Sequence, residues 1–147
     1  MKQTRLWIAL ILMLVSLPLS ACNPKAASGE KIQPAQLEPM NDGTDRKRVL
    51  LTEKAAERID LQTAPVEAKQ VNGAERKVIP YAAVIYDTAG GTWVYTNPEA
   101  LTFLREPIVI DYIDGDQAIL SDGLASTDRI VTVGVAELFG AETGVSK

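Results

Sequence analysis

The chain has 147 residues, one cysteine, no histidine and a formal net charge of −4. Without histidine it lacks the commonest general base and the commonest metal ligand, and a single cysteine cannot form a disulfide within the chain. The acidic balance argues against nucleic-acid binding and against a polybasic helix on a membrane surface, because both need clustered lysine and arginine.

Residues 1–21 have the pattern of a secretory signal. A basic start, Met1–Arg5, is followed by ten apolar residues from Leu6 to Val15, and small residues lead into Cys22. The apolar run is too short to span a bilayer, which takes roughly 20 residues. The sequence Leu19-Ser-Ala-Cys22 resembles the lipobox that the lipoprotein signal peptidase cuts, and this resemblance implies a lipid on the Cys22 sulfur. The alternative is an ordinary secreted protein with one unpaired thiol.

Cleavage before Cys22 removes Lys2 and Arg5, so the net charge of −4 becomes −6. We expect a mature protein in the cell envelope, facing the periplasm and anchored to the inner or outer membrane through the lipid on Cys22. In enteric-type sorting an aspartate after the cysteine favours the inner membrane, so Asn23 points mildly to the outer membrane.

The next segment, residues 22–48, has three prolines and no aromatic residue, whereas all seven aromatic residues that follow Cys22 lie beyond it. This composition predicts a flexible tether that reaches about 28 Å on average. An unstructured remnant without a spacing role is the alternative. We expect one folded domain at 49–142 and a short tail at 143–147.

Most signals within this domain are strand signals. A short helix is predicted at 53–59 with Thr52 as its N-cap, and a closing helix or turn at 136–139. Trp93 and Tyr95 share one strand face, and we expect Trp93 to be mostly buried. Turns are predicted at 87–91, 97–99, Asp114-Gly115 and Asp122-Gly123. Extended segments are predicted at 49–51, 61–66, 78–80, 83–86, 92–96, 101–105, 107–112, 117–120 and 129–133.

Short strands with glycine and proline turns predict a mainly β fold, a small antiparallel β-barrel or sandwich with one or two short helical turns. Val49–Val66 is expected to pair with the C-terminal strands although it is distant from them in sequence.

Candidate catalytic and metal-binding groups are scarce. Because Cys22 is assigned to lipid, no thiol nucleophile remains. Asp111, Asp114 and Asp116 lack the spacing of a calcium loop and the closing glutamate, and they are better interpreted as carboxylates beside strands and turns. Met40 is the single methionine after the signal, which gives little support to soft-metal transport. We therefore expect no enzyme, no catalytic residue, no cofactor and no metal site.

A set of segments in fixed order carries a resemblance to a known family. In the second half of the chain they are VIPYAAVIYD at 78–87, GTWVY at 91–95, IDGD at 113–116, LSDGL at 120–124, DRIVTVG at 128–134 and AELFGAE at 136–142. These resemble the C-terminal region of the periplasmic adaptor proteins, or membrane fusion proteins, of RND-type efflux pumps. Residues 51–67 resemble the N-terminal lead-in of the same proteins, with Asp60 where glycine is common.

A full adaptor carries a barrel, a lipoyl-like sandwich and a helical hairpin between its two ends. Here only eleven residues, Glu67 to Lys77, separate Val66 from Val78. The resemblance implies a membrane-proximal domain assembled from both chain ends, closed by a turn at Asn72-Gly73. It does not extend to the hairpin that meets an outer-membrane channel.

The resemblance implies a lipid-anchored, non-enzymatic protein that associates with an RND-type transporter or a full-length adaptor. We expect the contact to involve the strands and loops around Asp111–Asp128, with a basic patch on the partner. The alternative is a free-standing envelope lipoprotein that binds a ligand or a protein and has no role in a pump.

Overall fold

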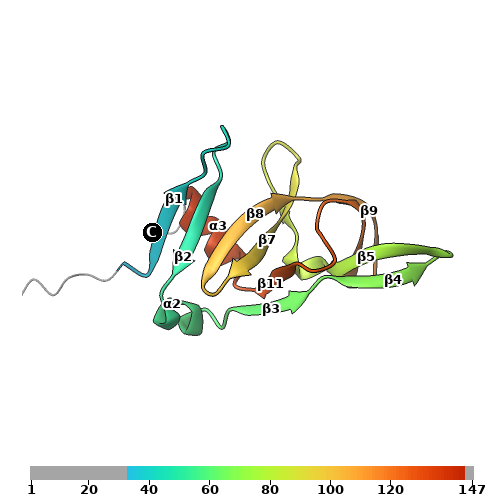
Figure 1. The fold of residues 1–147 in the computed structure, drawn as a ribbon, viewed down its shortest axis with the longest axis horizontal. Coiled ribbons are helices and arrows are strands. Elements are labelled where there is room, and N and C mark those ends of the chain that lie inside the picture. Colours follow the sequence, from blue (N-terminus) through green and yellow to red (C-terminus); the bar gives the residue numbers. More distant parts are fainter. Residues whose placement is uncertain (1–32, 145–147) are drawn as a thin grey trace, which may run out of the picture. The chain divides into compact units, whose positions relative to one another are not determined.

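The protein is represented by a computed structural model, which describes residues 33–144. These residues form two antiparallel sheets with two α-helices and one 3-10 helix (Figure 1). The predicted mainly β class is confirmed. Within residues 33–144 the strand order closes neither sheet on itself, so the sandwich describes the fold and the closed barrel does not. The predicted signal, Cys22 and residues 22–32 of the predicted tether lie outside the described residues.

The larger sheet has seven strands in the order β1-β2-β8-β7-β11-β3, with β6 paired to β7. Its edge strand β3 pairs with β11, where Pro65 lies opposite Arg129. The predicted pairing of the lead-in segment with the C-terminal strands is therefore confirmed. The strands are β1 (Ala35–Pro39), β2 (Lys47–Leu51), β3 (Gln62–Pro65), β6 (Ile85–Tyr86), β7 (Thr92–Glu99), β8 (Thr102–Pro107) and β11 (Arg129–Val133).

The smaller sheet has four strands in the order β4-β5-β10-β9. They are β4 (Glu67–Val71), β5 (Ala74–Pro80), β9 (Val109–Asp114) and β10 (Gln117–Asp122). The turn between β4 and β5 is Asn72-Gly73, with φ of 52° and 80°. Two successive positive φ values make a type I′ hairpin turn, for which Asn-Gly is the preferred pair, so this prediction is also confirmed. The hairpin extends to the right in Figure 1.

The helices are short. α2 (Glu53–Arg58) begins after Thr52, whose side chain accepts a 3.2 Å hydrogen bond from the Ala55 amide, as the N-cap prediction requires. η1 (Tyr81–Ala83) lies between the segments predicted as extended at 78–80 and 83–86, overlaps the second at Ala83, and buries Ala83. α3 (Val135–Thr143) is longer than predicted and starts after Gly134, at φ 89°. None of the described helices is long and apolar enough to cross a membrane.

Two apolar clusters form the core. The first joins the two sheets, because its members come from both: Val66, Ile79, Ala83, Val94, Ile108, Ala118, Leu120, Leu124 and Ile130. The second lies between the larger sheet and α3, and consists of Val49, Ile85, Tyr95, Phe103, Val131, Val135 and Leu138. Val94 and Tyr95 enter different clusters, since neighbouring residues of a strand face opposite sides of the sheet.

The predicted start of the domain at residue 49 is wrong. β1 lies inside the predicted tether and pairs with β2 from Ala35 opposite Leu51 to Pro39 opposite Lys47. The composition of residues 22–48 predicted a tether because an edge strand can form with little apolar surface. Among the residues of β1, only Ala35 packs against the second cluster. Pro39 stands at the end of this edge strand, where its missing N–H costs no ladder bond.

The turn predicted at 97–99 is also wrong. β7 continues to Glu99, and its pairing with β8 shifts register between Thr96 and Glu99. The Asn97 side-chain amide donates to the carbonyl oxygens of Glu99 and Thr102, at 2.6 and 2.9 Å. These bonds hold the irregular stretch in the sheet and make room for Pro98 within a strand.

Candidate functional site

Two adjoining hollows form a groove beside the loop that connects β10 to β11. Both are lined by Glu106 and Asp128, which makes them continuous. The first hollow has a volume of about 380 Å³ and is otherwise lined by Pro107, Val109, Asp122, Gly123, Leu124 and Ala125. The second has a volume of about 480 Å³ and is otherwise lined by Thr96, Asn97, Pro98, Leu104, Thr127 and Arg129.

Backbone contacts fix the loop that borders the groove. Gly123 has a φ of 121°, and a Cβ atom there would lie 3.1 Å from Ile108 Cα and from the Pro107 carbonyl oxygen, so the turn requires glycine. The carboxylate of Asp122 accepts from the Gly123 amide at 2.8 Å, and that of Asp128 accepts from the Ala125 amide at 2.7 Å. The acidic side chains of the loop therefore point to defined positions at the groove.

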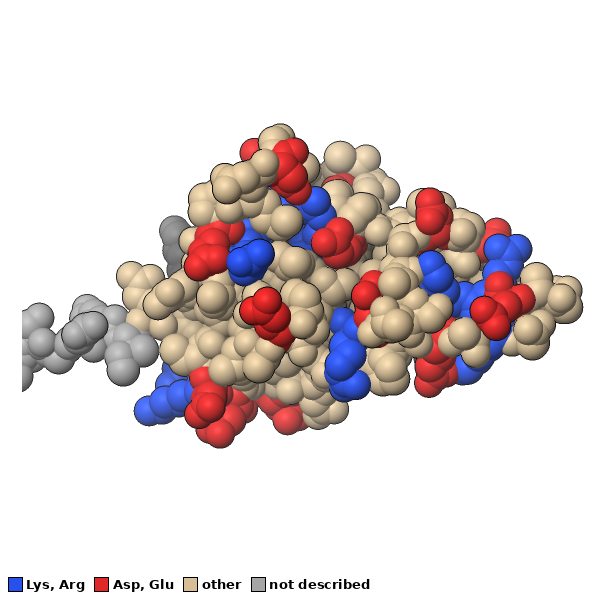
Figure 2. All heavy atoms as spheres, viewed as in Figure 1, with Lys and Arg blue, Asp and Glu red and all other residues tan. Residues whose placement is uncertain are grey.

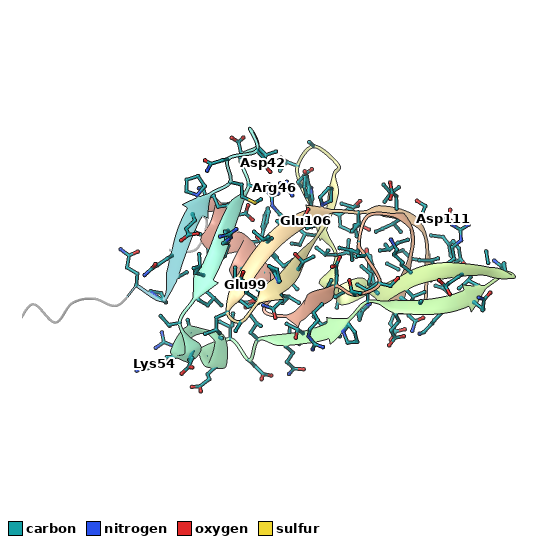
Figure 3. The ribbon with its side chains drawn as sticks, viewed as in Figure 1. Asp42, Arg46, Lys54, Glu99, Glu106 and Asp111 are labelled. Carbon is teal, nitrogen blue, oxygen red and sulfur yellow. The ribbon has the colours of Figure 1, made fainter. Side chains whose placement is uncertain are left out.

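Glu106 has a cationic partner. Its carboxylate accepts from Arg46 at 2.9 Å, and Arg46 also donates to the Arg105 carbonyl oxygen and to Asp42. Figure 3 shows Asp42, Arg46 and Glu106 close together. Hydrogen bonds from the hydroxyl and amide of Thr44, aided by Arg46, lower the pKa of Asp42 to about 2.

The other carboxylates that line the groove belong to Asp122 and Asp128, and they accept hydrogen bonds from backbone amides. Arg129 directs its guanidinium to Thr63, at 2.9 and 3.1 Å from the hydroxyl and the carbonyl oxygen. The groove therefore combines apolar and polar lining residues with net negative charge, an arrangement that favours a cationic side chain. Elsewhere on the surface drawn in Figure 2, acidic and basic side chains are interspersed.

A second polar cluster is buried under α3. Glu142 is 2% exposed and accepts hydrogen bonds from the Tyr95 hydroxyl, from Arg105 Nε and from the Lys47 amide. Burial, followed by the bond to Glu142, raises the pKa of Tyr95 well above its usual range. Because every bond of this carboxylate goes to the body of the domain, we interpret the cluster as the attachment of α3 to the larger sheet.

Trp93 is less buried than predicted. The burial expected for it belongs to Tyr95 and Phe103, while Trp93 is only partly buried at the rim of the second cluster. Its indole N–H donates to Asp87 at 2.8 Å, and this bond is the main cause of the lowered pKa of Asp87. The guanidinium of Arg105 lies 4.8 Å from the Trp93 ring centroid. Because its indole N–H needs a hydrogen-bond partner, Trp93 stays at the surface of the core with its ring packed inward.

The sequence-predicted site residues do not meet at one place. Asp111 forms an exposed pair with Arg76 at 3.8 Å, and Asp114 ends β9. In residues 33–144 no group of three histidine, cysteine or acidic side chains is arranged to hold a metal ion. Cys22, the predicted lipidation site, lies outside the described residues. Sequence reasoning missed Glu142, because nothing in its neighbourhood distinguishes it from a surface glutamate of a helix end.

Comparison with known proteins adds one structural match. No protein-family model matches the chain, and no curated protein matches it. An NMR structure of SilB from Cupriavidus metallidurans CH34, which encompasses its N-terminal metal-binding site and membrane-proximal domain, is 21% identical and superposes with a TM-score of 0.44. The match covers 52% of this chain and 42% of that one, so this chain spans less than half of the SilB fragment.

Proposed function

We propose that the protein is a non-enzymatic, lipid-anchored envelope protein that acts as the membrane-proximal part of an efflux-pump adaptor does. In this role it associates with an RND-type transporter or with a full-length adaptor. The observation that carries the proposal is the junction of the two chain ends: lead-in strand β3 pairs with C-terminal strand β11, and the β4–β5 hairpin directly follows β3.

This junction matches what the sequence resemblance implies. The segments that resemble the two ends of an adaptor, 51–67 and 78–142, contribute to one sandwich and to a shared apolar cluster that includes Val66 and Ile130. A turn at Asn72-Gly73 closes the chain where an adaptor carries its other domains. The proposed role is therefore that of a membrane-proximal domain without the part that reaches an outer-membrane channel.

The distance to the membrane supports the same role. β1 is the first element of the described residues, and thirteen residues, 22–34, separate the proposed lipid on Cys22 from Ala35. Thirteen residues span at most about 45 Å when fully extended. In this proposal the domain is therefore held close to the membrane that carries the lipid.

Anchoring and role are tested together in cells. Wild-type protein is expected in the membrane fraction, and Cys22→Ser is expected to remain unprocessed or to be released, with Ser28→Ala as a matched change outside the lipobox. Deletion of the gene should increase sensitivity to a panel of detergents, dyes and metals, and only lipidated protein should restore resistance. Wild-type protein recovered as a soluble, unacylated species would contradict the anchor.

The contact is tested by cross-linking in cells. A photoreactive residue at exposed Ser126, in the loop beside the groove, should capture a transporter or a full-length adaptor. As the control, the photoreactive residue replaces Lys54, which is exposed on α2 (Figure 3). Unchanged drug sensitivity after gene deletion, together with no transporter or adaptor among the captured proteins, would contradict the proposal and favour the alternative of a free-standing lipoprotein.

A further inference from the structure

The edge strands of the two sheets are protected unequally. The ends of the two sheets are β1 and β3 in the larger and β4 and β9 in the smaller. Proteins protect such edges from pairing with other chains by proline, lysine or irregular geometry. β1 ends in Pro39, β3 ends in Pro65 and β4 carries Lys69, whereas β9, Val109–Asp114, contains neither proline nor lysine.

β9 also concentrates exposed apolar side chains. Of the seven large apolar side chains that are exposed in the described part of the chain, three lie on this strand: Val109, Tyr112 and Ile113, at 53%, 38% and 40%. Register shifts interrupt its pairing with β10 around Leu120, but Tyr112–Asp114 pairs regularly with Gln117–Ile119. The C-terminal half of β9 therefore offers a regular edge that is apolar and open to solvent.

An acidic hollow adjoins the beginning of the same strand. Val109 lines the first hollow of the groove together with three carboxylates, those of Glu106, Asp122 and Asp128. Its volume of about 380 Å³ is enough for a long side chain. Asp111 and Asp114 add negative charge along β9 itself; Figure 3 labels Asp111 beside the β4–β5 hairpin.

We propose that β9 is the docking strand for an extended, basic segment of a partner protein. The segment pairs with the β9 backbone and places a lysine or arginine side chain in the first hollow, as in strand-addition recognition, where the backbone gives affinity and pockets give specificity. Charge argues for this occupant and against a second copy, because pairing of two β9 strands would bring their aspartates together. The inference rests on the proposed function for the existence of an envelope partner, and it adds the surface and chemistry of recognition.

The test measures binding of a labelled synthetic peptide of alternating lysine and valine to the full chain in detergent. Ile113→Lys introduces a repelling charge on β9 and should weaken binding about tenfold or more. The matched control is Leu37→Lys, on edge strand β1, where the replaced side chain is 39% exposed against 40% for Ile113. This control should bind as wild type does. The same peptide with alternate backbone amides N-methylated, and a glutamate-valine peptide, should both bind at least tenfold more weakly.

A second variant covers the case in which Ile113→Lys does not fold. Asp111→Asn combined with Asp114→Asn removes two charges from β9 and leaves the turn residues Gly115 and Asp116 unchanged. It should weaken peptide binding and reduce its salt dependence, while Asp45→Asn, at an exposed site in the turn before β2, changes neither.

Three results would overturn the inference: equal weakening by Leu37→Lys, undiminished binding of the N-methylated peptide, or a protein dimer that Ile113→Lys dissociates, which would make a second copy the occupant. The peptide assay also separates the two proposals. If the wild-type protein does not bind the peptide but deletion of the gene increases drug sensitivity, only the inference fails. If the wild-type protein binds the peptide but deletion of the gene has no effect, only the proposed function fails.

Discussion

Tyr95 and Glu142 form the most buried polar contact of the described residues. Tyr95 is fully buried, Glu142 is 2% exposed, and the hydroxyl of one donates to the carboxylate of the other. Arg105 and the Lys47 amide satisfy the remaining acceptor positions, so that no buried side-chain nitrogen or oxygen in residues 33–144 is left without a partner. A charge is tolerated at such a site only because it is fully hydrogen-bonded.

This contact predicts the behaviour of Tyr95→Phe. Loss of a hydrogen bond to a charged group should lower the free energy of unfolding by about 1.5–3 kcal/mol at neutral pH. The pKa of Tyr95 is raised in the folded state, so its stabilising contribution is complete below the ordinary value of 10 and is lost as pH rises toward the folded-state pKa. Stability should therefore fall above pH 10 in the wild type and fall less in Tyr95→Phe.

The measurement is urea unfolding at a series of pH values, with Tyr86→Phe as the control. Tyr86 is 53% exposed, and its pKa is raised chiefly by a hydrogen bond with Tyr81. The control should match the wild type at neutral pH and retain a decline above pH 10 from Tyr95. A Tyr95→Phe protein as stable as the wild type at neutral pH would show that the contact does not stabilise the fold.

At the scale of elements, the predictions that succeeded rest on local chemistry. Thr52 caps a helix through its own side chain, and Asn72-Gly73 forms a turn with positive φ at both residues. Gly115, with a φ of 59°, begins the turn after β9. The predictions that failed depend on partners distant in sequence. β1 exists because β2 is beside it, and β7 passes Pro98 because Asn97 bonds across to Thr102. Composition and periodicity carry no signal for either.

The same distinction applies within one strand face. Trp93 and Tyr95 were correctly assigned to one side of β7, and both pack on the second cluster. Which of them is buried depends on α3 and β8, and these elements cover Tyr95 and leave Trp93 at the rim with Asp87 and Arg105. The groove likewise could not be predicted, because it combines loop aspartates with Glu106 from a strand.

Burial therefore predicts an order among aromatic substitutions. Phe103→Ala should lower the free energy of unfolding by about 3–5 kcal/mol, because Phe103 is 1% exposed in the second cluster. Trp93→Ala should cost clearly less, although tryptophan is the larger side chain. Urea unfolding of both variants, with Tyr112→Ala as an exposed control at 38%, measures this order. A larger loss for Trp93→Ala would place Trp93 in the core after all.

For the whole molecule, the fold depends on strands from both ends of the described chain. β2 pairs with β8 and β3 pairs with β11, and Val49, fully buried, packs with Leu138 of α3. The second cluster takes Val49 from β2 and its other buried members from residues 85–138, so strands from both ends of the described chain pack in one core. The hairpin β4–β5 connects these two parts of the chain.

Truncation tests this dependence. A chain that starts at residue 33 should fold and melt cooperatively. One that starts at Val49 lacks β1 and the first two residues of β2 and should melt about 5 °C or more lower, since the rest of β2 loses one of its two neighbouring strands. A chain that starts at Val78 lacks β1 to β4 and the first four residues of β5. It should not fold, because β8 and β11 each lose one of their two neighbouring strands and β5 is cut short. Circular dichroism melts compare the three, with removal of residues 145–147 as the control. Equal stability of the chains from residues 33 and 78 would show that the C-terminal half alone is the folding unit.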